Sequence, residues 1–332
     1  MASIIKQVKE SVEKMDKIGV SKRELRLNGQ KPEIHSHKQK EHTLSAGYNF
    51  AKWVRNEYNV KKLHQLTPKH YEKYIHHLEN RERSKGHLRN IETALRFLER
   101  GFQKFSEEYG KEIITFTSEK RLIAPAKRTE NIQDRSYSNF EIEQVIPKMS
   151  DNMQKAVTLM HELGLRSEEV SKIRVEHIEG GRLFISQGEG ITKGGRHRLI
   201  EIPNKLNNDI EKMLEGKEET DRLVPIRSDS IRKMNNEAFK KVGLETDGRG
   251  CHGYRYAYAY KRVKELMNSK EQKMLSKVLK RYGEGKNADY GVHNKGVYND
   301  MKEKMDLIHS ELGHGKNRFD LAFRYMNSLK EV

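Results

Sequence analysis

Seven side chains able to do chemistry lie in four separated segments of this 332-residue chain. The segments read ELGLRSEEV, TKGGRHRLIEIP, HGYRYAYAY and ELGHGKNRFDLAFRYM, and their reactive residues are Arg166, Glu169, Lys193, His252, Arg255, His314 and Tyr325. The positions of His252 and Arg255 put both side chains on one face of a helix. Tyr325 is the only tyrosine of its segment. A lone tyrosine usually packs, so its neighbours must decide whether it reacts.

Phosphodiester transesterification needs each of these residue types. A tyrosine oxygen can attack phosphorus and remain as a covalent phosphotyrosyl link. Guanidinium groups stay charged and donate paired hydrogen bonds to the charge that develops on the phosphate oxygens. A lysine on a hairpin can protonate a departing 5′-oxygen, and a histidine can bind a phosphate oxygen or accept the tyrosine proton. The set predicts strand cleavage without a metal or a cofactor.

The order and context of the motifs resemble the tyrosine recombinases, the phage-integrase type of site-specific recombinase. Gly-Leu-Arg-x-x-Glu, Lys-Gly, His-x-x-Arg, Leu-Gly-His and a late tyrosine follow one another between residues 164 and 325. One such motif is weak evidence, whereas five in order are specific. The step of eleven residues from His314 to Tyr325 is longer than the family usually shows, and so is the distance from Arg255 to His314.

The resemblance implies a role for each residue. Arg166, Arg255 and His314 would bind the scissile phosphate. Lys193 would be the general acid, although Arg196 and Arg198 lie on the same hairpin and any of the three could contact phosphate instead.

The remaining roles also follow from the resemblance. His252 would be a general base or a phosphate ligand, Glu169 would support the arginine and histidine cluster, and Tyr325 would be the nucleophile. The family works through a 3′-phosphotyrosyl intermediate, as a tetramer on double-stranded DNA that exchanges strands through a Holliday junction. The sequence thus predicts a DNA recombinase or integrase, expected to serve a mobile genetic element.

Two alternatives stay open. A type IB topoisomerase or a telomere resolvase would use the same phosphotyrosyl chemistry, and a non-catalytic DNA-binding accessory protein could keep the fold. We expect accessory DNA-bending proteins as a further class of partner, no membrane partner, and a cytoplasmic, nucleoid-associated location in a prokaryote or virus.

The charge of the chain agrees with a nucleic-acid partner. The formal net charge is +17, and residues 1–130 alone contribute +11. Neutralising phosphates with lysine and arginine releases counterions and drives binding. A single cysteine, Cys251, excludes an internal disulfide and is expected to be a buried thiol. No apolar run approaches the ~20 residues of a membrane span.

The elements that must position the reactive residues are mostly helical. We expect a mainly α fold with a small antiparallel sheet or hairpin, arranged as a two-domain DNA clamp. Residues 1–30 would form an arm or extra helix, 31–118 a core-binding domain, 119–136 a linker and 137–332 the catalytic domain. The last would contain an insertion at 264–306 that supplies protomer or DNA contacts.

Apolar spacing locates the individual elements. In the first domain, buried stripes are predicted at Leu44, Tyr48 and Ala51, with Trp53 and Val54 beside them, and at Leu88, Ile91, Leu95, Leu98 and Phe102. Thr67 and Ser138 are predicted helix caps, the second in a capping box with Glu141. In the second domain a buried stripe is predicted at Met153, Ala156, Val157, Met160 and Leu163. GRLFIS and HRLIEIP are predicted strands joined by QGEGITKGGR. A metal site at His35, His37 and His42 is disfavoured, because their spacing matches no standard zinc pattern.

Overall fold

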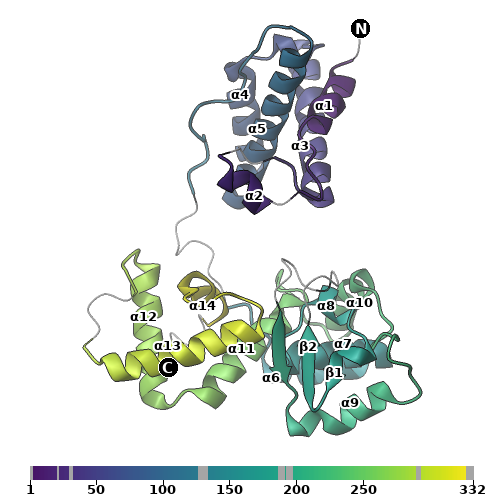
Figure 1. The fold of residues 1–332 in the computed structure, drawn as a ribbon, viewed down its shortest axis with the longest axis vertical. Helices are drawn as coiled ribbons and strands as arrows, with labels where there is room; N and C mark the ends of the chain where they lie inside the picture. Colours follow the sequence, from purple (N-terminus) through teal and green to yellow (C-terminus); the bar gives the residue numbers. More distant parts are fainter. Residues whose placement is uncertain are drawn as a thin grey trace. The chain divides into compact units, whose positions relative to one another are not determined.

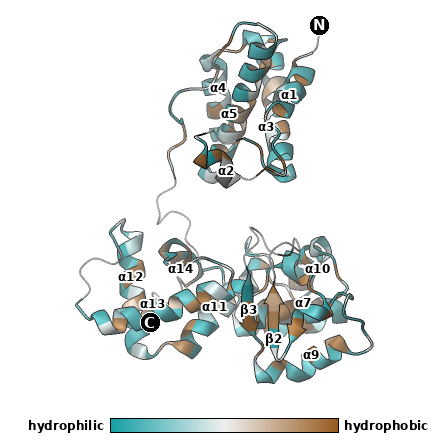
Figure 2. Ribbon diagram, in the orientation of Figure 1, coloured by the Kyte–Doolittle hydropathy of each residue, from teal (hydrophilic) through white to brown (hydrophobic). Residues whose placement is uncertain are grey.

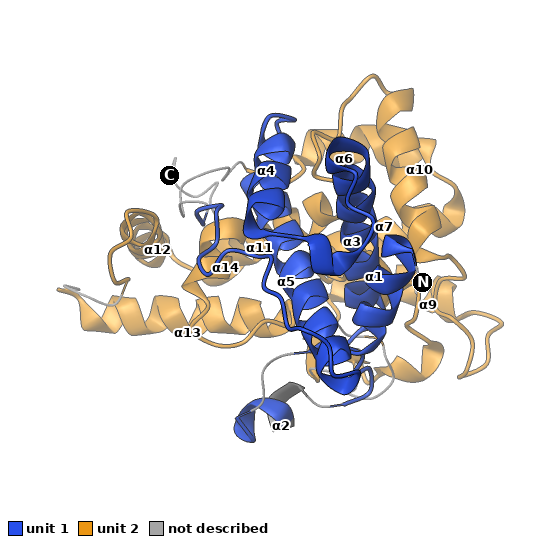
Figure 3. Cartoon of the chain, turned by 90° about the horizontal axis from the view of Figure 1, so that it is seen from above, with its two compact units in different colours: residues 1–127 blue, residues 128–332 orange. Residues whose placement is uncertain are grey.

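The computed structural model describes residues 3–20, 22–29, 33–125, 134–185, 191, 197–288 and 293–326. The chain divides into two compact units, residues 1–127 and 128–332 (Figure 3). The fold is mainly helical with one small antiparallel sheet, as predicted (Figure 1). No helix in these ranges is long and apolar enough to cross a membrane.

The first unit is a helical bundle. Its elements are α1 (Ile4–Glu13), α2 (Lys22–Leu27), α3 (His37–Tyr58), η1 (Leu63–Gln65), α4 (Pro68–Glu79) and α5 (Lys85–Glu108). Helices α1, α3 and α5 pack on one another, and the predicted stripe of α5 is buried among them. Helix α4 starts at Pro68 directly after Thr67, as predicted, because proline needs no backbone partner there.

The predicted buried face of α3 is partly wrong. Leu44 and Tyr48 are only half-buried, and the core face is instead formed by Thr43, Ala46, Gly47, Phe50, Ala51 and Val54. Gly47 allows this phase, because a Cβ there would lie 2.8 Å from a methyl of Val8 on α1. The close approach of α1 at Gly47 therefore turns Leu44 and Tyr48 away from the core face of α3.

The second unit holds the remaining elements. They are α6 (Asn139–Val145), η2 (Ile146–Lys148), α7 (Asp151–Glu162), α8 (Ser167–Val170), η3 (Val175–His177), β1 (Ile178–Glu179), β2 (Arg182–Ile185), β3 (Arg198–Glu201), η4 (Asn204–Leu206), α9 (Asn207–Leu214), α10 (Ser228–Lys241), α11 (His252–Leu266), α12 (Ser269–Gly283), α13 (Lys295–Glu311) and α14 (Phe319–Tyr325).

The sheet of this unit is a three-stranded antiparallel sheet in the order β1-β2-β3. The two predicted strands are confirmed as β2 and β3, in a register that pairs Leu183 with Ile200 and Ile185 with Arg198. The short strand β1 was not predicted. Inward residues alternate along β3, so Arg198 shares the buried side of the strand with Ile200.

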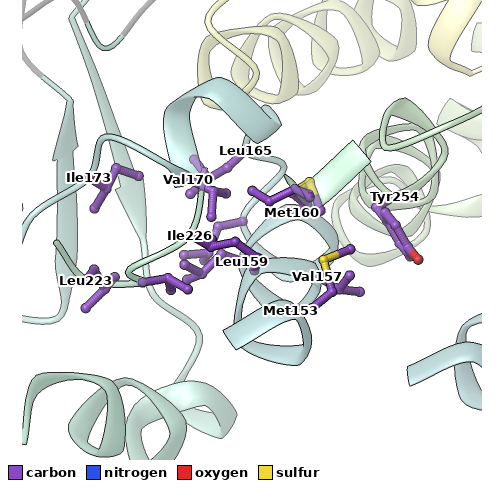
Figure 4. Packing of buried hydrophobic residues seen from close by; sticks show 14 of the residues in the cluster. Met153, Val157, Leu159, Met160, Leu165, Val170, Ile173, Leu223, Ile226 and Tyr254 are labelled. Carbon is purple, nitrogen blue, oxygen red and sulfur yellow. The ribbon is translucent and has the colours of Figure 1, made fainter. Parts of the chain in front are cut away.

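Helix α11 joins two hydrophobic cores of this unit. One core surrounds α7 and includes the predicted stripe of Met153, Ala156, Val157, Met160 and Leu163 (Figure 4). The other surrounds α12, α13 and α14. Tyr254 of α11 lies in the first core, whereas Tyr258 and Val263 lie in the second. Hydrophobic and hydrophilic residues are both distributed along these helices (Figure 2).

The stretch 264–306 contains all of α12 and most of α13. Helix α12 packs against both α13 and α14, and its Leu275, Val278 and Leu279 are buried with Phe323 of α14. These helices therefore support the short helix that carries Tyr325. The connection between α12 and α13 lies partly outside the described residues.

Candidate active site

Arg166 and Glu169 are joined at the start of α8. Arg166 is the N-cap residue; its backbone N–H and its Nη1 each donate to a different carboxylate oxygen of Glu169, both at 2.7 Å. Glu169 is fully buried. Burial alone would raise its pKa, but the charges of Arg198, Arg166 and Arg255 hold the pKa below its ordinary value. Glu169 is therefore a carboxylate that orients arginines.

Arg198 is a site residue that sequence reasoning did not assign. Its Nη2 donates to Glu169 at 2.5 Å, and both side chains are buried. Its Nε and Nη1 are buried without a hydrogen-bond partner in the described part of the chain. The sequence placed Arg198 on the hairpin as one of three residues that could contact phosphate, and the alternation of β3 puts its side chain on the buried side of the strand.

Arg255 is buried on the first turn of α11. Its Nη1 donates to the carbonyl of Gly164 and its Nη2 to the carbonyl of Leu312, so the guanidinium connects the Gly-Leu-Arg and Leu-Gly-His segments. Burial, then the charge of Arg166, lowers its pKa to about 10. The group is therefore still charged at neutral pH, with its Nε buried and without a partner among the described residues.

The space and backbone conformation at the glycines of the Gly-Leu-Arg and Leu-Gly-His motifs leave no room for a side chain. Gly164 and Gly313 both have positive φ, at 62° and 66°. A Cβ on Gly164 would lie 2.5 Å from the ring of Tyr258, and one on Gly313 would lie 2.6 Å from Nη1 of Arg198. Any larger residue would displace the backbone that holds Arg255 or the side chain of Arg198.

His314 lies between Arg255 and a second histidine. Its Nε2 is 3.4 Å from Nη2 of Arg255, and its Nδ1 is 3.2 Å from Nδ1 of His309. Burial, then the charge of Arg255, lowers the pKa of His314 to about 2. His309, at the end of α13, was missed in the sequence although it follows Met305 and Ile308 along the buried face of the helix.

Tyr325 lies beside this cluster. Its ring stacks on Tyr256 with centroids 4.2 Å apart, and its centroid lies 5.1 Å from that of His314. The guanidinium carbon of Arg255 lies 5.9 Å from the Tyr325 centroid. The predicted nucleophile and the predicted phosphate ligands are therefore neighbours. Tyr256 was not anticipated, since its segment HGYRYAYAY was read only for His252 and Arg255.

His252 begins α11, one turn before Arg255, as predicted. Partial desolvation, then the charges of Arg255 and Arg166, lower its pKa below the ordinary 6.5. The ring is therefore neutral near pH 7, with one donor and one acceptor nitrogen. Lys193 falls outside the described residues, and so does Arg196.

The other sequence candidates were Cys251, next to His252, and the histidines of the first unit. Cys251 is half-buried rather than fully buried, and burial raises its pKa to about 11. His35 contacts the carbonyl of Val20 through Nδ1. Within the described ranges, no group of three histidine, cysteine or acidic side chains is placed to hold a metal ion.

The charges of these side chains suit the site to binding an anion. Three guanidinium groups, Arg166, Arg198 and Arg255, act on the buried carboxylate of Glu169, and the neighbouring histidines are neutral. The excess of positive charge is held next to a phenol. A phosphate ester would satisfy both features.

Comparison with solved structures identifies the fold of the chain. No family model and no curated protein sequence matches the chain. A dimer of lambda integrase bound to a COC′ core site is 14% identical, with TM-score 0.60 over 97% of this chain and 95% of that chain. XerH recombinase bound to palindromic difH substrate is 13% identical, with TM-score 0.60 over 99% and 92%. The Tn1549 transposon integrase on circular-intermediate DNA is 9% identical, with TM-score 0.53 over 98% and 99%.

The chain therefore has the fold of the tyrosine recombinases, and the resemblance seen in its motifs is confirmed at the level of the fold. The similarity extends over nearly the whole chain, so it includes both compact units.

Proposed function

We propose that this chain is a tyrosine site-specific recombinase that cleaves and rejoins double-stranded DNA. The observation that carries the proposal is the placement of Tyr325 beside Arg255 and His314, with Arg166 held next to them by Glu169. The fold shared with DNA-bound recombinases supports it. We further propose that it works as a tetramer at recombination sites, in the service of a mobile element.

Each residue has a role in the proposed reaction. The oxygen of Tyr325 attacks phosphorus while Arg166, Arg255 and His314 bind the non-bridging oxygens. The bond to the 5′-oxygen breaks, and Lys193 supplies the proton that this leaving oxygen takes. The phosphotyrosyl link keeps the energy of the broken bond, so the reverse attack by a 5′-hydroxyl rejoins the strand.

His252 completes the proton balance. As a neutral ring it accepts the phenolic proton of Tyr325 through its acceptor nitrogen, and the hydrogen on its other nitrogen is available to a phosphate oxygen. Glu169 stays ionised and fixes the direction of the guanidinium groups. No step of this scheme needs a cofactor.

Covalent trapping in cells tests the proposal. Cells expressing wild type, Tyr325→Phe or Tyr256→Phe are lysed in denaturant, and the DNA still attached to protein is sequenced. Tyr256→Phe is a matched control, because it removes the hydroxyl of the ring stacked on Tyr325. We expect adducts at discrete sites with wild type and Tyr256→Phe, and none with Tyr325→Phe.

The other outcomes select the alternatives. Adducts scattered over the genome, with relaxation of plasmids that lack a specific site, would favour a type IB topoisomerase. Absence of adducts from all three proteins, with DNA binding retained, would favour a non-catalytic DNA-binding protein. Adducts that persist in Tyr325→Phe would reject Tyr325 as the nucleophile.

A further inference from the structure

His309 is a buried histidine that the proposed reaction does not use. It is fully buried at the end of α13, and the backbone N–H of His314 donates to its carbonyl at 2.7 Å. Its Nδ1 is 3.2 Å from Nδ1 of His314, its Nε2 is buried, and the backbone of Arg318 lies close enough to raise the pKa of the ring. A packing role would not need a polar ring here.

The contact between the two rings requires them to share a proton. Burial lowers the pKa of His309 to about 4, although the carboxylates of Asp306 and Asp320 act to raise it. The pKa of His314 is lower still, at about 2. Both rings are therefore neutral near pH 7, and a neutral imidazole has one donor nitrogen and one acceptor nitrogen. One Nδ1 must donate and the other must accept.

Arg255 selects the arrangement of the free protein. Its Nη2 faces Nε2 of His314 at 3.4 Å, and a guanidinium can only donate. Nε2 of His314 is then the acceptor, its hydrogen is on Nδ1, and Nδ1 donates to His309. His309 in turn carries its own hydrogen on Nε2.

A bound phosphate reverses this choice. Phosphate oxygens accept, so a neutral His314 can bind one only through a hydrogen on Nε2. Its Nδ1 is then an acceptor and needs a donor, which His309 provides once its hydrogen is on Nδ1. In this exchange Nδ1 of His314 passes its hydrogen to Nδ1 of His309, Nε2 of His309 releases its hydrogen to water, and Nε2 of His314 takes one up from water. Each ring carries one hydrogen before and after, so the pair gains and loses no proton.

We infer that His309 is a positioning residue that pairs with Nδ1 of His314 in either arrangement, and that it thereby lets His314 change from acceptor to donor when phosphate binds. The inference rests on the proposed function for its role in cleavage. The hydrogen bond between the rings stands without that function.

Two substitutions of nearly equal shape separate this role from packing. His309→Asn keeps an amide that can donate or accept near the position of Nδ1, whereas His309→Leu has the same branching without polar atoms. A packing role would favour leucine over asparagine at a fully buried site. The proposed role favours asparagine.

The first measurement is nuclear magnetic resonance of the full chain with nitrogen-15 in its histidines. His314→Gln identifies the His314 signals. In wild type we expect a protonated Nδ1 on His314, and inorganic phosphate should shift the hydrogen toward Nε2. In His309→Leu the shift on adding phosphate should be smaller, because Nδ1 of His314 has lost the ring that could donate to it. A His314 ring that responds to phosphate equally in wild type and His309→Leu would overturn the inference, whether or not the protein cleaves DNA.

The second measurement is single-turnover cleavage of the DNA site recovered by covalent trapping. By analogy with the loss of a partner that orients a ligating histidine, His309→Leu should slow cleavage about 10–100-fold. His309→Asn should keep most of the rate, and DNA affinity should be the same in both. A leucine variant that cleaves as fast as the asparagine variant would overturn the role. If wild type itself forms no adduct, the proposed function fails and the resonance result still decides the contact.

Discussion

Arg166 and Arg255 have the same predicted role but different surroundings. Arg166 keeps 22% of its side chain exposed and contacts Glu169. Arg255 is fully buried and donates to two backbone carbonyls, Gly164 and Leu312. The first can be removed without leaving buried carbonyls unpaired, whereas the second cannot.

We predict that Arg166→Ala removes about 3–4 kcal/mol of transition-state stabilisation, as the loss of one oxyanion donor does. Arg255→Ala should lose as much in cleavage, and each carbonyl left unpaired should cost about 1–3 kcal/mol of folding free energy. Single-turnover cleavage, DNA titration and urea unfolding measure the three quantities. DNA affinity should change far less than cleavage, because many basic residues share binding.

Equal losses of binding and cleavage in Arg166→Ala would contradict its assignment to the scissile phosphate. Equal stability of the two alanine variants would contradict the structural part of the Arg255 argument.

At the scale of elements, α8 offers a matched pair of carboxylates. Glu169 is buried between Arg166 and Arg198, whereas its neighbour Glu168 pairs with Arg232 while both side chains stay about half exposed. We predict that Glu169→Ala lowers the free energy of unfolding by about 3–5 kcal/mol, because it leaves Arg198 as an uncompensated buried charge. Glu168→Ala should cost about 0–1 kcal/mol.

Urea unfolding of the two variants measures this difference. If Glu169→Ala does not fold, Glu169→Gln retains a hydrogen-bonding side chain and should still lose more stability than Glu168→Gln. Similar losses for both positions would show that the buried carboxylate does not hold the arginines.

The contact between α13 and the Leu-Gly-His segment makes stability depend on pH. The pKa of His309 is about 4 in the folded protein and about 6.5 when unfolded. Below pH 6.5 the unfolded chain takes up a proton that the folded chain does not, so stability falls as the pH falls. From pH 7 to pH 5 this one group should cost roughly 2 kcal/mol.

His309→Asn removes that titrating group, so its stability should fall by about 2 kcal/mol less than that of wild type over the same interval. Urea unfolding at several pH values measures it, with exposed His42→Asn as the control. Parallel curves for His309→Asn and wild type would mean that His309 is not held neutral by the fold.

These elements also explain what the sequence could predict. Stripes of five apolar residues located α5 and α7, and the capping box of Ser138 and Glu141 located α6, because local pattern and burial agree there. The phase of α3 was wrong, since the approach of α1 at Gly47 is a tertiary contact that α3 does not encode.

The difference between local sequence pattern and tertiary contact also explains which site residues were predicted and which were missed. Arg166, Arg255, His314 and Tyr325 stand in motifs that can be compared with a family. Arg198 and His309 stand on the buried sides of a strand and a helix, and only the assembled fold brings them to Glu169 and His314. Their polar side chains at apolar positions were the available signal.

At the scale of the whole molecule, the positive charge is divided between two tasks. Residues 1–130 carry +11 of the net +17. Arg81 and Arg83 illustrate the exposed part, on the connection between α4 and α5, whereas Arg198 and Arg255 are buried. Salt screens exposed charges strongly and buried charges much less. Binding and chemistry should therefore respond differently to salt.

We predict that DNA affinity falls linearly on logarithmic axes with salt, by about 10³–10⁵ between 50 and 200 mM if 6–10 phosphates are contacted. The single-turnover cleavage rate at saturating DNA should change little over the same range. Arg81→Gln combined with Arg83→Gln should reduce the slope by about 2 if both residues contact phosphates, without changing that rate. A cleavage rate at saturation that falls in parallel with affinity would mean that the exposed charges also take part in the chemistry.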